Sequence, residues 1–76
     1  MKESKHFADM LKERGIKKEW VDLVFDSPDR VEEKGDGTRH FIKRIPEFGN
    51  RWLRIIVNTT TTPEILITAY FDRRVR

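Results

Sequence analysis

The spacing of apolar residues changes once along this chain, near residue 31. Before that point Phe7, Met10 and Leu11 recur at intervals of three and one, which is the spacing of one face of an α-helix. After it, apolar and polar residues alternate through segments such as RWLRIIVN, residues 51–58, as in strands with one buried face. A chain with its helices first and its strands last is predicted to form an α+β domain.

Two helices are expected in the first part of the chain. Ser4 is a suitable N-cap for the first helix, and Gly15 is a typical residue just beyond its end. The second helix should run from about Lys18 to Phe25. It should stop there because Pro28 disfavours helical geometry at the residue before it.

Four strands are expected after residue 30. They are RVEEK (30–34), TRHFIKRI (38–45), RWLRIIVN (51–58) and EILITAYF (64–71), separated by the turn GDG and the loops EFGN and TTTTP. Such short connections join consecutive strands into an antiparallel meander. We therefore predict one α+β domain, residues 1–76, in which two N-terminal helices pack on one face of a four-stranded antiparallel sheet.

Alternation sorts the side chains of the last two strands onto two faces of the sheet. The apolar sets, which the helices should cover, are Leu53, Ile55 and Val57 on one strand and Ile65, Ile67, Ala69 and Phe71 on the other. A TTTTP hairpin that closes with residue 58 opposite residue 64 places Arg54 across from Thr68. The same register places Trp52 across from Tyr70 on the uncovered face.

The register of the second strand is open between two alternatives. One puts His40, Ile42 and Arg44 beside Arg54, whereas a slip of one residue or a bulge in the loop puts Lys43 there instead. The apolar pair of residues 41 and 45 is the stronger core set on this strand, which favours the first register.

Charge is distributed unevenly along the chain. Residues 1–37 contain eight Lys or Arg and ten Asp or Glu, whereas residues 38–76 contain eight and three. Seven of the eight cations in the second half are arginines, and arginine binds phosphate through two parallel hydrogen bonds and stacks on bases. With aromatic residues between these arginines, the second half indicates a nucleic-acid-binding surface. The alternative is a sheet surface whose charges serve only solubility.

Several classes of protein are excluded by what the sequence lacks. It has no cysteine, hence no disulfide and no thiolate metal site. The two histidines are 34 residues apart without nearby carboxylates at ligand spacing, so we expect neither a metal nor another cofactor. No stretch approaches the roughly 18 apolar residues of a membrane span, and nothing resembles a signal peptide. We expect a cytoplasmic protein without membrane contact.

The remaining polar residues suit one kind of chemistry. Metal-independent RNA cleavage needs a base for the 2′-hydroxyl, cations for the charge on phosphorus and an acid for the leaving 5′-oxygen. Histidine, arginine, lysine and tyrosine supply these roles, and aromatic side chains stack on single-stranded bases.

The segments KHFADMLKERGI, VDLVFDSPDRV, RWLRIIV and ILITAYF together resemble a family of small prokaryotic domains. Its pattern is a helix with His, seven residues and then Arg-Gly-Ile, a second helix ending in Pro-Asp, and a late strand containing Thr-x-Tyr. That family is grouped with toxins of toxin–antitoxin pairs of the BrnT, RelE and ParE types. The resemblance covers about residues 4–72 and implies a helix-plus-meander fold shared with barnase-like and colicin-type ribonucleases.

Carried over by position, the resemblance implies functional roles for His6, Arg14, Arg54, Thr68 and Tyr70, and Lys43 fits the family's basic position on the second strand. We expect catalysis from His6, Lys43, Arg54 and Tyr70, and RNA binding from Arg14, Arg44, Trp52, Thr68, Arg73 and Arg74. The C-terminal DRRVR and residues 69 and 71 depart from the family's pattern.

Each of these assignments has a structural alternative. His6 could bond only to the backbone of the sheet. Arg14 could only cap its own helix, or it could reach round the sheet edge to a phosphate or an acidic partner. The terminal arginines 73, 74 and 76 could contact RNA or form a disordered basic end.

These expectations combine into a toxin that inhibits translation by cleaving mRNA, either free or on the ribosome, without a metal. Its natural partner would be an acidic antitoxin that covers the basic face and forms a hetero-oligomer with it. The alternatives are a non-catalytic RNA- or ribosome-binding module and a protein-interaction domain.

Overall fold

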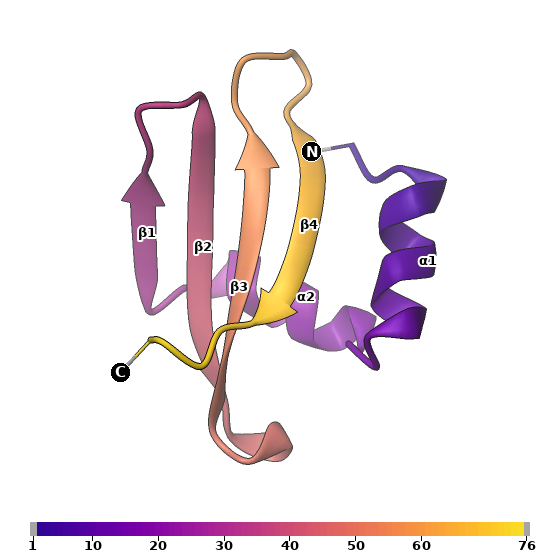
Figure 1. Cartoon of the computed structure of the whole chain (residues 1–76), viewed down its shortest axis with the longest axis vertical. Coiled ribbons are helices and arrows are strands. Elements are labelled where there is room, and N and C mark those ends of the chain that lie inside the picture. Colours follow the sequence, from indigo (N-terminus) through magenta and orange to yellow (C-terminus); the bar gives the residue numbers. More distant parts are fainter. Residues whose placement is uncertain (1, 76) are drawn as a thin grey trace.

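The computed structural model describes residues 2–75, and its elements follow the predicted order (Figure 1). They are α1 (Lys5–Glu13), α2 (Lys18–Asp26), β1 (Arg30–Glu33), β2 (Thr38–Ile45), a short 3₁₀ turn η1 (Pro46–Phe48), β3 (Arg51–Asn58) and β4 (Ile65–Phe71). All neighbouring strands are antiparallel, in the order β1-β2-β3-β4. The predicted α+β class and meander are therefore confirmed.

The boundaries of α1 coincide with local sequence signals. The Ser4 Oγ accepts a hydrogen bond of 3.1 Å from the Phe7 backbone N–H, which satisfies one free donor at the start of α1. Gly15 follows α1 with φ of 64°, a left-handed conformation that glycine adopts without a steric penalty. No helix within residues 2–75 is long and apolar enough to cross a membrane.

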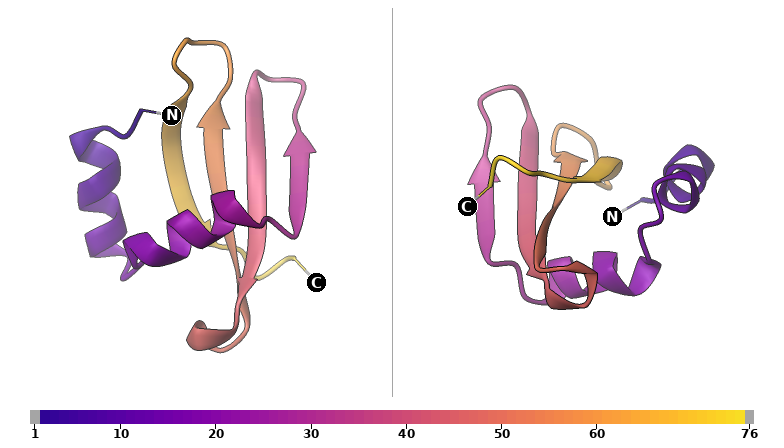
Figure 2. Two further views of the ribbon diagram at one scale, coloured as in Figure 1. Left: turned by 180° about the vertical axis from the view of Figure 1, so that it is seen from behind. Right: turned by 60° about the horizontal axis from the view of Figure 1, so that its bottom comes forward.

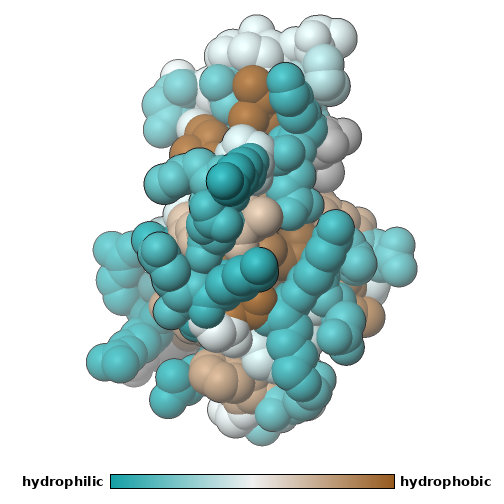
Figure 3. All heavy atoms as spheres, turned by 90° about the vertical axis from the view of Figure 1, so that its right-hand side faces the viewer, coloured by the Kyte–Doolittle hydropathy of each residue, from teal (hydrophilic) through white to brown (hydrophobic). Residues whose placement is uncertain are grey.

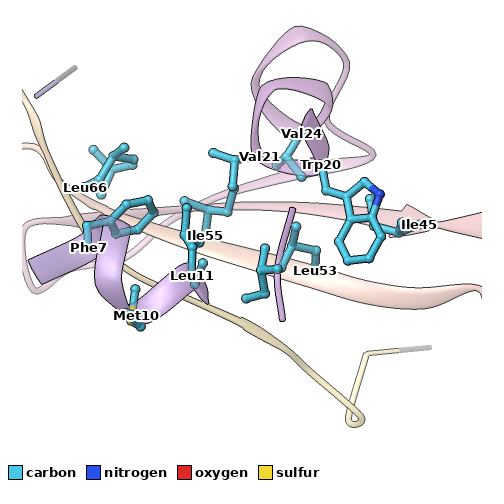
Figure 4. Close-up of a cluster of buried hydrophobic side chains, with 13 residues drawn as sticks. Phe7, Met10, Leu11, Trp20, Val21, Val24, Ile45, Leu53, Ile55 and Leu66 are labelled. Carbon is cyan, nitrogen blue, oxygen red and sulfur yellow. The ribbon is translucent and has the colours of Figure 1, made fainter. Parts of the chain in front are cut away.

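The helices lie differently against the sheet. α2 crosses one face of the sheet, whereas α1 runs beside the β4 edge (Figures 1 and 2). Both contribute to one apolar core with β3, and Figure 4 shows side chains from both helices pointing toward that strand. The fully or nearly fully buried members of this core are Phe7, Met10, Leu11, Ile16, Trp20, Val21, Val24, Ile45, Leu53, Ile55, Val57, Leu66 and Ala69.

The predicted register between β3 and β4 is wrong by two residues at its functional end. Arg54 pairs with Tyr70, and Ile56 pairs with Thr68. One residue of this difference arises because the hairpin closes with Asn58 opposite Ile65, and the other comes from a β-bulge at Ile56/Val57, which places an extra residue on one strand.

The bulge also changes which β4 residues face the core. Leu66 and Ala69 are both buried although they are three residues apart, while Ile67 is 43% exposed. Simple alternation cannot bury two residues at that spacing. The prediction that Ile65 and Ile67 share the core face with Ala69 is therefore wrong, and Leu66 faces the core in their place.

The register between β2 and β3 is the first of the two predicted alternatives, in which residues 40, 42 and 44 lie on the same face as Arg54. Ile42 pairs with Arg54, and Arg44 pairs with Trp52. Lys43 instead pairs with Leu53, which lies in the helix-covered core, so Lys43 points to the side of the sheet opposite Arg54.

The face of the sheet opposite α2 is not open as predicted, because the C-terminal segment crosses it (Figures 1 and 2). The Asp72 backbone N–H donates to the Trp52 carbonyl at 2.8 Å, where the segment leaves β4. Val75 is 8% exposed and Ile42 is fully buried, although neither belongs to the main core. A second, smaller buried region therefore lies beneath this segment.

Candidate functional site

Arg54 occupies the centre of the sheet face opposite α2. Its side chain is only 12% exposed. The Nε atom donates to Asp72 Oδ2 at 2.9 Å, and Nη1 lies 3.1 Å from Glu32 Oε1 and 2.8 Å from His40 Nδ1. We call these four residues the Arg54 network. Among the contacts of residues 2–75 the guanidinium uses Nε and Nη1, which leaves the two N–H donors of Nη2 for a ligand.

The Arg54 network holds one guanidinium and two carboxylates, and Lys34 and Arg74 outside it pair with Glu32 and Asp72. Burial alone would lower the pKa of the Arg54 guanidinium, but its hydrogen bonds to Glu32 and Asp72 outweigh burial and raise it. Burial alone would raise the pKa of Asp72, but hydrogen bonds from Arg74 and Arg54 lower it overall. Hydrogen bonds from Lys34 and then Arg54 lower the pKa of Glu32. Arg54 is thus a fixed cation with ionised partners.

Glu32, His40 and Asp72 of this network were not assigned functional roles from the sequence, and His40 is the one whose protonation state the contacts define. Because a guanidinium only donates hydrogen bonds, the His40 Nδ1 must accept from Arg54, so the imidazole is neutral and carries its proton on Nε2. Burial and then the charge of Arg54 lower the His40 pKa, consistent with that form. The sequence feature that could have identified His40 is the first of the two predicted β2 registers, because that register puts residue 40 beside Arg54.

Tyr70 lies directly across β3–β4 from Arg54, so both side chains leave the sheet on the same face. It is half-buried. The structure therefore brings together two of the four predicted catalytic residues.

Arg14 joins α1 to β4 through the edge of the sheet. Its Nη1 donates to the Ala69 carbonyl at 2.7 Å and lies 3.1 Å from Thr68 Oγ1. The Thr68 hydroxyl also contacts Met10 Sδ at 3.2 Å. Arg14 thus reaches the sheet edge as expected, but it binds the strand itself. This contact explains why an apolar helix face ends in an arginine.

His6 lies on the same side of α1 as Arg14, nearer to the N-terminus. Residues 6, 10 and 14 are each one helical turn apart, so their side chains form one row along the helix. Met10 and Arg14 of this row contact Thr68, while the His6 side chain is exposed. The surface on the α1 side is mostly hydrophilic, with apolar atoms visible between charged groups (Figure 3). His6 therefore flanks β4 on a solvent-accessible surface.

Lys43 does not contact Arg54, Tyr70 or the α1 row. Its Nζ donates to the Ser27 carbonyl at 2.8 Å and is 3.8 Å from Asp29 Oδ1. These contacts fix the connection between α2 and β1 on the face opposite Arg54. The geometry accordingly gives Lys43 a structural position and does not bring it to Arg54 or Tyr70.

A second group of side chains surrounds Trp52 on the same face as Arg54. The guanidinium carbons of Arg30 and Arg44 lie 5.7 and 5.9 Å from the centroid of the Trp52 ring, within cation–π range. Arg73 and Arg74 are exposed on the C-terminal segment, and Arg74 donates to Asp72 Oδ1 through its backbone N–H at 2.9 Å. Arg76 lies outside the described residues.

The arrangement has no cluster suited to a metal ion within residues 2–75. Its chemistry is that of a nearly buried cation, a phenol, an exposed imidazole and a cationic aromatic surface. Such groups can bind a polyanion, stabilise added negative charge and move a proton.

Comparisons with known proteins identify a family without assigning an activity. No curated protein and no solved structure matches the chain. A family model described as a domain of unknown function, DUF4258, matches residues 4–71. This match spans both helices and all four strands, so the chain belongs to the DUF4258 family.

Proposed function

We propose that this protein is a metal-independent endoribonuclease of the toxin type. The observation that carries the proposal is the pairing of Arg54 with Tyr70 on one sheet face, beside the α1 row that begins with the exposed His6. A single RNA strand must cross the sheet to contact all three side chains, because the Arg54 guanidinium bonds to Glu32 of β1 and His40 of β2 whereas His6 lies on α1 beside the β4 edge. The resemblance to toxins of the BrnT, RelE and ParE types supports the same assignment.

Each of these side chains has a role in the proposed reaction. His6 removes the proton of a ribose 2′-hydroxyl, and the 2′-oxygen then bonds to phosphorus. Arg54 stabilises the added charge through Nη2. The bond to the 5′-oxygen breaks as that oxygen receives a proton, and Tyr70 either donates this proton or positions the 2′-hydroxyl. His40 positions Arg54 by accepting its hydrogen bond.

An acidic antitoxin is the partner that this proposal implies. The chain carries a formal net charge of +3 at pH 7, and its exposed arginines gather near the proposed RNA path. Carboxylates of a partner would compete with phosphate for these cations and form a hetero-oligomer. We place this system in the cytoplasm, where mRNA and ribosomes are present.

The second candidate is an RNA-binding module without cleavage. The observation that favours it is the Trp52 ring with Arg30 and Arg44 beside it, because stacking and cation contacts suffice for binding. In that case each arginine substitution weakens binding by degrees, and binding falls steeply with salt.

Cleavage of a long mRNA in excess EDTA tests the proposal. The wild type should give discrete fragments, and Tyr70→Phe and His6→Gln should reduce the rate by about 100-fold or more while retaining RNA binding. Lys18→Gln removes an exposed cation from α2, on the opposite side of the sheet, and should cleave like the wild type.

Circular dichroism of every variant checks that it is folded. Binding without fragments, on free mRNA and on translating ribosomes alike, would reject catalysis and favour the binding module. Equal cleavage by the wild type and Tyr70→Phe would reject the proposed site.

A further inference from the structure

A pocket lies where the chain leaves β4 and turns across the sheet. Its volume is about 350 Å³, and it is lined by Arg51, Trp52, Phe71, Asp72, Arg73 and Val75. Pockets of this size hold small organic groups. Its lining contains two aromatic rings, two cations and a carboxylate, which is a composition suited to a flat, negatively charged ligand.

The pocket is held open by contacts within the protein. The Asp72 N–H bonds to the Trp52 carbonyl at 2.8 Å, and the Asp72 side chain is 3% exposed between Arg54 and Arg74. Val75 is buried at the other end of the segment. Because both ends of the segment are anchored, a ligand would enter a preformed site, which reduces the entropy lost on binding.

The aromatic residues of the pocket are also fixed. Phe71 stacks on Phe48 with ring centroids 4.6 Å apart, and the guanidinium groups of Arg30 and Arg44 lie over the Trp52 ring. An indole that lines a pocket is a stacking platform for a base, which would take the place of one of these guanidinium groups on the ring. Arg51 and Arg73 are both exposed. The Arg51 guanidinium carbon lies 5.1 Å from the centroid of the Phe48 ring, and a guanidinium stacked on a ring keeps its in-plane N–H donors for a phosphate.

Asp72 does not oppose an anionic ligand. Its carboxylate oxygens accept hydrogen bonds from Arg54 and Arg74, so its charge is compensated inside the protein. The cations that line the pocket therefore make its electrostatic potential positive.

We propose that this pocket binds one nucleobase of a single-stranded RNA, with the base stacked on Trp52 and its phosphate on Arg51 and Arg73. The inference rests on the proposed function and deepens it. Trp52 and Arg54 are two residues apart on β3, or about 7 Å, and both lie on one face. The pocket therefore holds a nucleotide adjacent to the one whose phosphate meets Arg54, and it sets the position of the strand.

A fluorescence titration tests this inference, because the chain has two tryptophans and Trp20 is 3% exposed in the core. In Trp20→Phe the emission comes from Trp52 alone. We use a 2′-O-methyl RNA decamer, which lacks the nucleophilic hydroxyl, and a decamer of abasic sugar-phosphate as its control. The RNA decamer should quench Trp52 strongly, and the abasic decamer should not.

Affinity measurements separate stacking from charge. Trp52→Leu should weaken binding of the RNA decamer at least tenfold, whereas Trp52→Phe should largely restore it because a ring is retained. Arg51→Gln and Arg73→Gln should each weaken both decamers by several-fold and reduce the salt dependence. Circular dichroism confirms that each variant remains folded.

The outcomes distinguish this inference from the proposed function. If the RNA decamer binds in a salt-dependent manner but neither quenches Trp52 nor weakens with Trp52→Leu, the pocket assignment is overturned and the RNA-directed function stands. If neither decamer binds and long mRNA is left intact, the proposed function fails and the pocket assignment fails with it. Quenching of Trp52 by the RNA decamer alone, together with weaker binding of that decamer to Trp52→Leu, establishes the base site.

Discussion

On the α2 side of β3, Leu53, Ile55 and Val57 are fully buried among apolar side chains. On the other side of the same strand, Arg54 is nearly as well buried, but by two carboxylates and an imidazole. Apolar contacts are non-directional and roughly proportional to area, so the first face contributes stability with little demand on orientation. The second face fixes donors and acceptors in space, which is what binding and catalysis require.

The two faces should therefore respond differently to substitution. Substitutions in the apolar core should affect stability most, and substitution of His40 should affect it least.

The largest effect is expected in the apolar core. Leu53→Ala should lower the free energy of unfolding by about 2–5 kcal/mol, because it removes fully buried atoms and leaves a cavity. A domain of this size has only about 4–11 kcal/mol to lose. Urea unfolding followed by circular dichroism measures the loss.

Ile56→Ala on the opposite face of β3 is the matched reference for that substitution. Ile56 is half-buried, so its loss should be clearly smaller. Equal losses for the two variants would mean that the two faces do not differ as described.

An intermediate effect is expected in the Arg54 network. Asp72→Asn should cost about 1–3 kcal/mol, since Arg54 loses a charged partner but keeps Glu32 and some contact with water. Its cost should largely vanish in an Arg54→Met background, because the coupling between the two residues is then absent. If Asp72→Asn lowers the free energy of unfolding equally in the wild type and in Arg54→Met, Asp72 stabilises the protein independently of Arg54.

The ionisation of Asp72 predicts how the stability of the protein changes with pH. The pKa of Asp72 is lowered in the folded protein, so its stabilisation is present above the unfolded value of about 3.9 and is lost as the pH falls through the folded pKa. The stability difference between wild type and Asp72→Asn should therefore be constant from pH 7 to 5 and shrink below about pH 4. A difference that grows on acidification would contradict the network.

The smallest effect is expected from His40. Its pKa is lowered by burial and by Arg54, so the folded protein binds a proton less readily than the unfolded chain does. Stability should fall as the pH drops below about 6.5 toward the folded pKa, and this fall should be shallower in His40→Gln. Urea midpoints between pH 7 and 5 measure it. Identical pH profiles would show that His40 is not the acceptor of the Arg54 bond.

Local patterns in the sequence were sufficient for the secondary structure. The Ser4 cap, the glycine after α1 and the alternation of RWLRIIVN are all properties of neighbouring residues, and each is found in the structure. The core residues of β2 and β3 followed from the same alternation. The first β2 register followed as well, because a shift of one residue would have exposed the apolar pair of residues 41 and 45.

The pairing of Arg54 with Tyr70 could not be predicted in this way. It depends on where the hairpin closes and on a bulge in β4, which lets Leu66 and Ala69 both be buried. Arg14 bonds to β4 beside this bulge, and such contacts link residues more than fifty positions apart.

Composition and local periodicity were enough to predict the α+β class, the order of the elements, their approximate ends and the arginine-rich character of the second half. Three features could be found only in the folded chain: Lys43 lies apart from Arg54, His40 accepts from Arg54, and the C-terminal segment covers part of the sheet and forms a pocket. These features arise from long-range packing and from hydrogen bonds between residues distant in the chain, which neighbouring residues do not encode.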